Sequence, residues 1–314
     1  MHATQSVQTQ VRAEIKGPVG YLILDRPERK NALSFDMWKE VTRLINEFGA
    51  NRALRVVVLR GARDLPFCSG ADISEFETVR ANAEGARAYE EANVVAFDAI
   101  AACPLPTIAM IRSFCMGGGM GLAAACDLRV AAESAEFAIP PGKLGLAYPP
   151  SAIRYIVAAI GASNAKDLLY SARRVKAVEA EKLGLINKLT EEDALESEVE
   201  KLASVISENA PLSLKAGKLA INYAAGYEFA QDMKAVKDAA TLPVSEQVSA
   251  QMTEDDDEET LIWQRAGGAG AFRAWVAAES GAVKRLRHYL TRERQLDPAR
   301  ACFMAYWSRG KSHV

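Results

Sequence analysis

The chain has 314 residues, of which 49% are hydrophobic and 25% charged, and its formal net charge is −2. This composition is ordinary for a globular protein, and the length allows one large domain or two of medium size. The near-neutral charge excludes a broad basic surface for nucleic acid or for an anionic membrane, so any anionic ligand must meet local positive charges.

The cysteines are odd in number, widely spaced and without a CxxC pair; they are Cys68, Cys103, Cys115, Cys126 and Cys302. This spacing indicates neither a disulfide framework nor a zinc site, so we expect reduced, mostly buried thiols and no bound metal. The first residues lack the apolar core of a signal peptide, and no apolar run is long enough to cross a bilayer. We therefore expect a cytoplasmic protein with no membrane partner.

A βαβ unit is predicted near the N-terminus. The runs at 19–27 and 55–61 are rich in leucine or β-branched residues and end at proline or glycine, as strands do. Between them, residues 34–50 carry apolar side chains at helical spacing, and Ser34 is placed to cap this helix.

The alternation of strands and helices continues through the middle of the chain. The pattern predicts a helix over 81–103, a buried strand over 106–114, a helix opened by the glycines of 115–127, and strands at 128–134 and 135–140. From residue 151 onward the spacing becomes mostly helical, which predicts an α/β core followed by helices.

We expect the α/β core, with the binding site, to occupy 1–205 and a helical C-terminal region to occupy 206–314. The second region contains an acidic run at 253–260, a glycine-rich break at 266–271 and a predicted basic helix at 283–295. We interpret these as surface features of an insertion and expect the region to contribute to oligomerisation.

Three consecutive glycines in CMGGGMGLAAACD (115–127) stand between a predicted strand and a predicted helix. A P-loop is excluded because no Gly-Lys-Ser/Thr follows, and a dinucleotide fingerprint is excluded because Leu122 stands where a small residue is required. The remaining chemical use is an oxyanion hole, in which N–H groups at a helix N-terminus meet an oxygen with developing negative charge. A tight packing turn is the structural alternative.

The glycine run does not stand alone, because other motifs accompany it in a fixed order. These are RPERKNAL (26–33), SGADI (69–73), GGG…ACD (117–127) and AEFAIP…LGL (135–146). With this combination the chain resembles the enoyl-CoA hydratase/isomerase (crotonase) family over about residues 12–228. Each motif by itself is weak, but their order is specific.

The resemblance implies a crotonase-like spiral of ββα turns with a helical C-terminal region, and a homotrimer or a dimer of trimers. It implies an acyl-CoA thioester as the substrate, with coenzyme A as part of that substrate and no separate cofactor. It also places the thioester oxygen between the backbone N–H groups of Ala71 and Gly118, where two fixed dipoles stabilise an enolate.

Further site residues follow from the resemblance alone. Asp72 and Asp127 match family positions, and we expect both to be structural caps or hydrogen-bond acceptors. The resemblance assigns coenzyme A contacts to Arg29 and Lys30 near the phosphates and to Ser69, Ala71, Asp72, Ile73 and Ser74 along the rest of the molecule.

Two positions depart from the family pattern. Hydratases of the family carry one glutamate shortly after the glycine run and another after the AxF strand, where this chain has Gly121 and Pro141. Isomerases of the family keep the second glutamate. Neither Gly121 nor Pro141 can move a proton, although general acid–base catalysis needs a titratable group at the transferred proton.

Tyr148 is the candidate replacement. Methylmalonyl-CoA decarboxylases of the family resemble the chain here, with proline and tyrosine at the positions of Pro141 and Tyr148, but they keep a glutamate at Gly121 and a histidine at Ala71. A phenol with a pKa of about 10 is a poor base at neutral pH and a good hydrogen-bond donor. The alternative is that Tyr148 anchors its loop.

Three functions stay open at this point. The first is a hydratase/isomerase-like lyase that works through an oxyanion-stabilised enolate. The second is an acyl-CoA decarboxylase or C–C hydrolase that uses Tyr148. The third is a non-catalytic subunit that binds coenzyme A or serves in assembly. The remaining candidate carboxylates are expected to be solvated surface charges; they are Glu75, Glu77, Glu90, Glu91 and Glu136.

Overall fold

The computed structural model describes residues 10–227 and two further strands at 274–279 and 301–307. The chain forms two compact units, 1–232 and 233–314. Three predicted features of the tail lie outside the described residues; they are the acidic run 253–260, the break 266–271 and the basic helix 283–295.

A six-stranded sheet forms the centre of the first unit, with the strand order β1-β2-β3-β4-β6-β9. Its strands are β1 (Val11–Lys16), β2 (Val19–Leu24), β3 (Val56–Gly61), β4 (Thr107–Ile111), β6 (Leu128–Ala132) and β9 (Lys188–Thr190). The first pair is antiparallel and the other four pairs are parallel. Strand β1 was not predicted, although its residues, VRAEIK, alternate between apolar and polar as in a half-buried strand.

A smaller sheet contains β5 (Phe114–Met116), β7 (Glu136–Ala138) and β8 (Val175–Lys176). The prediction of one strand over 106–114 is therefore wrong, since this segment supplies β4 and the start of β5. The chain leaves the large sheet at Ser113, whose φ of 55° is not compatible with an extended strand. This turn carries the glycine run into the smaller sheet.

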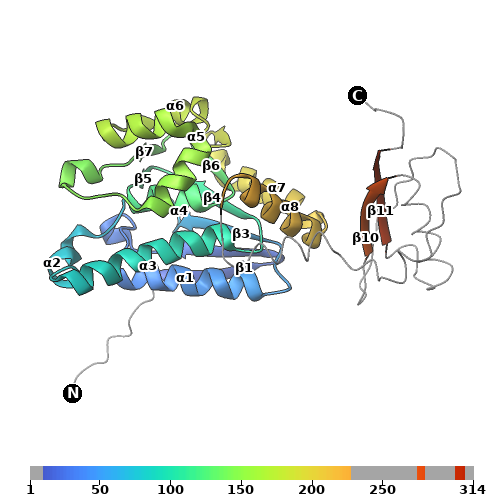
Figure 1. The fold of residues 1–314 in the computed structure, drawn as a ribbon, viewed down its shortest axis with the longest axis horizontal. Helices are drawn as coiled ribbons and strands as arrows, with labels where there is room; N and C mark the ends of the chain where they lie inside the picture. The colour runs from blue at the N-terminus through green and yellow to red at the C-terminus, as the bar shows by residue number, and fades with distance from the viewer. Residues whose placement is uncertain (1–9, 228–273, 280–300, 308–314) are drawn as a thin grey trace, which may run out of the picture. The chain divides into compact units, whose positions relative to one another are not determined.

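The helices cover both sheets. They are α1 (Phe35–Ala50), α2 (Phe76–Val79), α3 (Ala83–Ala102), α4 (Gly118–Ala125), α5 (Pro150–Ser171), α6 (Ala177–Lys182), α7 (Leu195–Glu208) and α8 (Pro211–Ala224). Helices α1 and α3 lie side by side in front of the large sheet (Figure 1). The predicted N-cap at Ser34 is confirmed, because its side chain accepts a hydrogen bond from the Met37 N–H.

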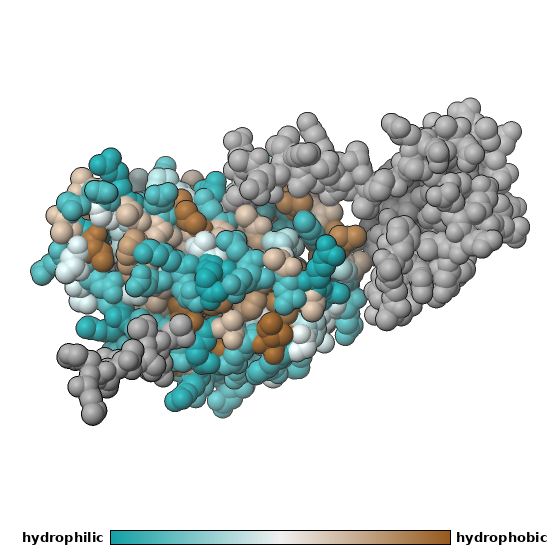
Figure 2. Space-filling model, turned by 90° about the horizontal axis from the view of Figure 1, so that it is seen from below, coloured by the Kyte–Doolittle hydropathy of each residue, from teal (hydrophilic) through white to brown (hydrophobic). Residues whose placement is uncertain are grey.

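Two hydrophobic clusters lie on the two faces of the large sheet. Along β2, Leu22 and Leu24 belong to one cluster while Tyr21 and Ile23 belong to the other, as the two-residue period of a strand requires. The larger cluster packs under α1, α3, α4 and α5, and the smaller one packs against α7. On the outer face drawn in Figure 2, the described residues form small hydrophobic patches separated by hydrophilic ones.

The C-terminal region is helical only in part. Helix α8 follows the predicted pattern, but β10 (Ala274–Glu279) and β11 (Ala301–Trp307) form a parallel pair where helices were predicted. Both segments, AWVAAE and ACFMAYW, contain aromatic or β-branched residues that favour strands. The prediction of a helical C-terminal region with an extended tail over 206–314 is therefore wrong at these two segments.

Candidate active site

Two parallel segments approach each other at the site. The backbones of Cys68 and Cys115 pair as an isolated parallel β-bridge, and both thiols are free. The Cys68 N–H donates to the Phe114 carbonyl, and the Met116 N–H donates to the Cys68 carbonyl. This pairing aligns the chain before SGADI with the chain before the glycine run. Residues that follow the two cysteines by the same number of positions, such as Ala71 and Gly118, are therefore expected to lie beside each other.

Each segment then turns at a glycine. Gly70 has a φ of 111° and Gly117 a φ of 48°, conformations that residues with a side chain rarely adopt. A Cβ at Gly70 would also lie 3.2 Å from the Met116 carbonyl oxygen. The glycines are required here because the turns are left-handed and the two backbones are close together.

The N–H groups that follow these turns belong to Ala71 and Gly118. A Cβ built on Gly118 would lie 3.6 Å from the Ala71 nitrogen, and one built on Gly70 would lie 3.9 Å from the Gly118 nitrogen. The Leu33 N–H donates to the Gly70 carbonyl, and the Leu33 carbonyl accepts from the Asp72 N–H. Since these two bonds flank Ala71 on the side of Leu33, the Ala71 N–H points away from Leu33. Within the described residues, neither the Ala71 nor the Gly118 N–H donates a hydrogen bond.

The indole ring of Trp38 packs against Gly118, one of these two residues. A Cβ on Gly118 would come within 2.8 Å of the Trp38 ring, so the first residue of α4 rests directly on that ring. The Trp38 Nε1 donates to the Tyr89 hydroxyl at 3.2 Å, which fixes the ring between α1 and α3. Burial raises the pKa of Tyr89 to about 12, so this hydroxyl stays protonated at neutral pH.

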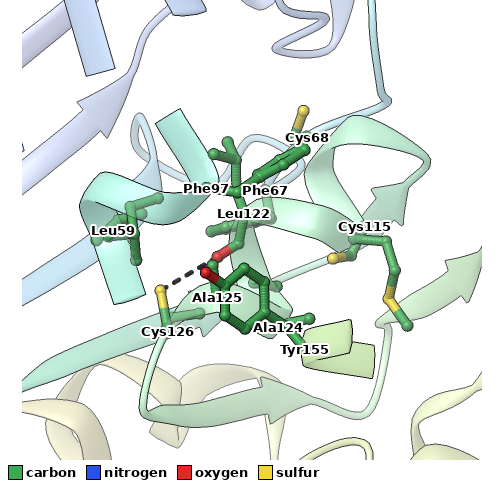
Figure 3. Close-up of a cluster of buried hydrophobic side chains, with 14 of the residues drawn as sticks. Leu59, Phe67, Cys68, Phe97, Cys115, Leu122, Ala124, Ala125, Cys126 and Tyr155 are labelled. Carbon is green, nitrogen blue, oxygen red and sulfur yellow. Dashed lines mark hydrogen bonds between the residues drawn. The ribbon is translucent and has the colours of Figure 1, made fainter. Parts of the chain in front are cut away.

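The space beside Gly121 is filled by Phe97. A Cβ at Gly121 would lie 2.6 Å from the Phe97 ring, and that ring packs edge-on against Trp38 with centroids 5.3 Å apart. Figure 3 shows Phe97 near Phe67 and Leu122 in the buried core. A longer side chain at position 121 would displace an aromatic ring, so glycine is also required here by packing.

Pro141 opens the short 3₁₀ helix Pro141–Leu144, close to the glycine run. The Cδ of the preceding Pro140 lies 3.8 Å from a Cβ built on Gly117. Both positions at which the family pattern has a glutamate are thus occupied by residues without a titratable group.

Tyr148 is buried, and its hydroxyl donates to the Gly117 carbonyl at 2.8 Å. The other side of the ring adjoins a cavity of about 140 Å³ lined mainly by apolar side chains of α5 and by Ile139. Burial raises the pKa of the Tyr148 phenol well above its ordinary value, so it is a neutral hydrogen-bond donor. The contact is the one expected if Tyr148 anchors its loop.

Asp72 turns inward instead of facing the site. Its carboxylate forms an ion pair with Arg26 at 2.7 Å and accepts hydrogen bonds from the Ser74 N–H at 3.0 Å and the Ser74 hydroxyl at 2.6 Å. Burial alone would raise the pKa of Asp72, but the contacts with Ser74 and Arg26 outweigh it and lower the pKa. The predicted capping role of Asp72 is confirmed, while Ile73 beside it is exposed.

The basic loop before α1 is held close to SGADI. The Ser69 hydroxyl donates to the Arg29 carbonyl at 3.1 Å, and the Ser69 N–H donates to the Lys30 carbonyl. Both basic side chains are exposed, and Lys30 lies over the Phe114 ring at 5.2 Å. Within the described residues neither one has a carboxylate partner, so both cations are available to an anionic ligand.

Two further polar candidates, Asp127 and Glu75, have structural contacts. Asp127 accepts from the Thr107 N–H and from Lys218 of α8, which confirms its predicted role as an acceptor. Glu75 is half-buried and accepts from the Phe35 N–H at 2.9 Å, so the prediction of a solvated surface charge is wrong for this residue. The segment after SGADI folds back over the start of α1 and brings Glu75 there.

The two cysteines beside the candidate site are buried. Burial raises the pKa of the Cys68 thiol to about 12 and raises the pKa of the Cys115 thiol well above its ordinary value, so both thiols stay protonated. Within the described ranges, no three His, Cys, Asp or Glu side chains are grouped closely enough for a metal ion. No helix among those residues is both long and apolar enough to cross a membrane.

Sequence reasoning missed Trp38 and Phe97. Both are apolar residues of predicted helices, and only their buried spacing on α1 and α3 could have singled them out. Their role as the support of the glycine turn depends on contacts between segments far apart in the chain.

The parallel spiral of strands, with a glycine-opened helix and two amides side by side, defines a protein of the crotonase fold class. The chain belongs to the enoyl-CoA hydratase/isomerase family, whose family model matches residues 14–255. The predicted family and fold are thereby confirmed.

Individual relatives agree with this result. The chain is 34% identical over 209 residues to the short-chain-enoyl-CoA hydratase of Clostridium acetobutylicum, which covers 67% of this chain and 79% of that protein. The crystal structure of an enoyl-CoA hydratase/carnithine racemase from Magnetospirillum magneticum has a TM-score of 0.67 at 34% identity and covers 78% of this chain and 86% of that one. An enoyl-CoA hydratase from Bacillus anthracis has a TM-score of 0.68 at 27% identity, over 77% and 95% of the two chains.

Proposed function

We propose that this protein binds an acyl-CoA thioester and stabilises an enolate of its acyl group with the N–H groups of Ala71 and Gly118. The observation that carries the proposal is the proximity of two unbonded amides at matched positions of two paired segments. Donors fixed in advance stabilise developing charge without reorganisation, and removing one such donor typically costs a factor of about 10²–10³ in rate. The CoA phosphates are assigned to Arg29 and Lys30, whose side chains are exposed and have no carboxylate partner in the part of the chain that the structure describes.

The proposed reaction generates the enolate by cleavage of a carbon–carbon bond. In a decarboxylation the bonding electron pair stays on the α-carbon as CO₂ leaves. In a retro-Claisen cleavage water adds to the β-carbonyl carbon, which departs as a carboxylic acid. Either route delocalises the electron pair onto the thioester oxygen, and the α-carbon then takes up a proton from water, or in the retro-Claisen route from the departing carboxylic acid. Neither route needs a base at the α-carbon, in agreement with Gly121 and Pro141 at the two glutamate positions.

The proposed role of Tyr148 is to orient the peptide that joins Gly117 and Gly118. The carbonyl of Gly117 and the N–H of Gly118 belong to one planar unit, so a hydrogen bond to the carbonyl fixes the direction of the N–H. Hydrogen bonds in such a chain also polarise one another, which strengthens the N–H as a donor. Positioning is preferred to proton donation because the Tyr148 proton is already donated to Gly117.

Other aspects of the protein are retained as proposals. They are a cytoplasmic location, assembly as a trimer or a dimer of trimers, and the absence of a cofactor other than the coenzyme A of the substrate. Hydration, the activity in the name of the Clostridium relative, is the competing reaction for this site.

The test is to incubate the purified full-length protein with crotonyl-CoA, methylmalonyl-CoA and a 3-oxoacyl-CoA and to follow the products by mass spectrometry. Release of CO₂ or of a carboxylic acid supports the proposal. Addition of water to crotonyl-CoA, with no cleavage of the other two thioesters, would overturn the cleavage step and leave the acyl-CoA site standing. If no thioester binds in calorimetry, the whole proposal is wrong.

A further inference from the structure

Arg129 is a buried cation that the site described above does not use. It lies in β6 opposite Ala109 of β4, and directly opposite residues share a face of a sheet, so its side chain is on the face of the larger hydrophobic cluster, to which Ala109 belongs. The residue is only 7% exposed, and an arginine remains protonated at neutral pH. A buried charge is costly unless it has partners, so the partners of this guanidinium call for an explanation.

The guanidinium binds the C-terminal end of α4. Its Nη1 donates to the Cys126 carbonyl at 2.7 Å and lies 3.5 Å from the Ala123 carbonyl oxygen. Its Nε donates to the Leu185 carbonyl at 2.7 Å. Ala123 belongs to the last turn of α4, and Cys126 is the C-cap of this helix. The last carbonyls of a helix carry partial negative charge, so a cation is stabilised at this end by the helix dipole.

The charge of Arg129 is not balanced by a carboxylate. Within residues 10–227, Arg129 forms no ion pair, and the neighbouring Asp127 is paired with Lys218 at 2.8 Å. Burial raises the pKa of the Cys126 thiol to about 12, so this neighbour is neutral. The C-terminal end of α4 therefore carries the positive charge of Arg129 beside an ion pair whose own charges cancel.

Helix α4 connects this charge to the candidate site, because Gly118 is its first residue. The helix has eight residues and is thus about 12 Å long, at a rise of about 1.5 Å per residue. The guanidinium then lies on the order of 15 Å from an oxygen bound at the Gly118 N–H. At an effective dielectric constant of about 20, two unit charges at this distance attract each other enough to change an equilibrium constant by roughly fivefold to tenfold.

We propose that Arg129 is a positioning residue of the candidate site, which fixes the C-terminal end of α4 and strengthens the binding of negative charge at the Gly118 N–H. The inference rests on the proposed function, since it needs an anionic oxygen at Ala71 and Gly118. The hydrogen bonds to Cys126 and Leu185 tie α4 to the segment that follows α6. The charge adds a positive potential along the helix axis that a neutral side chain of the same size would not supply.

The test compares two coenzyme A thioethers, which cannot be cleaved as thioesters are. Carboxymethyl-CoA carries a carboxylate near the position of the thioester oxygen, and carbamoylmethyl-CoA carries a neutral amide of nearly the same shape. Calorimetry gives the Kd of each ligand, and the ratio of the two values measures how strongly the site prefers the anion. Arg129→Met should lower this preference by about threefold to tenfold and change the Kd of the neutral ligand by less than about twofold.

A variant of opposite sign separates the effect of the charge from that of packing. Asp127→Asn keeps the shape of its side chain and removes a negative charge from the same end of α4, so the preference for the anion should rise by about twofold to fivefold. A loss of packing at this end would instead lower the preference in both variants. Arg52→Met removes an exposed arginine and is the control, expected to leave the preference unchanged because solvent and salt screen its charge.

Circular dichroism shows whether each variant is folded, and if Arg129→Met is not, the result for Asp127→Asn decides. A preference that is unchanged in folded Arg129→Met, or that does not rise in Asp127→Asn, overturns the inference and leaves the proposed function intact. If the wild type binds neither thioether, the proposed function fails and the inference fails with it.

Discussion

The two sides of the candidate site are built in different ways. On one side, two paired segments turn at glycines and present the N–H groups of Ala71 and Gly118, which rest on Trp38. On the other side, the positions of the family glutamates hold Gly121, covered by the Phe97 ring, and a proline. The comparison teaches that paired backbone segments hold two N–H groups close together on one side, whereas an aromatic ring fills the space beside Gly121 on the other. The predictions below test each side in turn.

The largest effect is expected on the amide side. Gly118→Pro removes the N–H and should lower kcat by a factor of about 10²–10³. Gly118→Ala is the matched control, because both variants add a Cβ that meets Trp38 while only the proline lacks the N–H. Proline is also tolerated at the first residue of a helix. Steady-state kinetics measure kcat for both variants. Equal kcat values for Gly118→Pro and Gly118→Ala would contradict the oxyanion assignment.

On the other side, restoring an acid should damage the protein without creating a hydratase. Gly121→Glu must displace the Phe97 ring and bury a carboxylate, so we expect a loss of about 3 kcal/mol or more in the free energy of unfolding. Gly121→Ala measures the effect of the Cβ alone, expected at about 1–3 kcal/mol, and a second change of Phe97→Leu should recover part of it. Urea denaturation checks these values, and a Gly121→Glu protein of unchanged stability would show that the ring does not restrict this position.

A smaller effect is expected where the two sides meet, at Tyr148. Tyr148→Phe loses the hydrogen bond to Gly117 and should cost about 1 kcal/mol in the free energy of unfolding. Because the Gly118 N–H is then less well oriented, kcat should fall by about tenfold while the Kd for the thioester stays nearly constant. Stopped-flow binding and turnover separate the two quantities. Unchanged turnover would assign Tyr148 to the stability of its loop alone.

The smallest effect concerns stability at alkaline pH. Burial raises the pKa of Tyr148 in the folded state, whereas in the unfolded chain the phenol ionises near its ordinary value of about 10. Its stabilising contribution is thus fully present below pH 10 and is lost as the pH rises above it. Unfolding by urea between pH 8 and pH 11 should show a shallower decline for Tyr148→Phe than for the wild type. The exposed Tyr170→Phe serves as the control, and equal slopes for all three proteins would refute the expected linkage.

Local signals in the chain were sufficient for much of the fold. The helix behind Ser34 and the cap at Asp72 both depend on neighbouring residues, and the structure contains both of them. The division of 106–114 into two strands was missed, because it depends on the left-handed turn at Ser113 and on pairing with β7. The hydrophobic pattern alone does not indicate where the chain passes from one sheet to another.

The sequence by itself determined the family, the alternation of strands and helices in most of the first unit, and the glycine run between a strand and a helix, because these follow from motif order and from local backbone preferences. Only the tertiary structure decided that Trp38 lies under Gly118, that Phe97 covers Gly121 and that Tyr148 bonds Gly117. These contacts join segments that are distant in the chain, and their partners are chosen by the packing of the whole core.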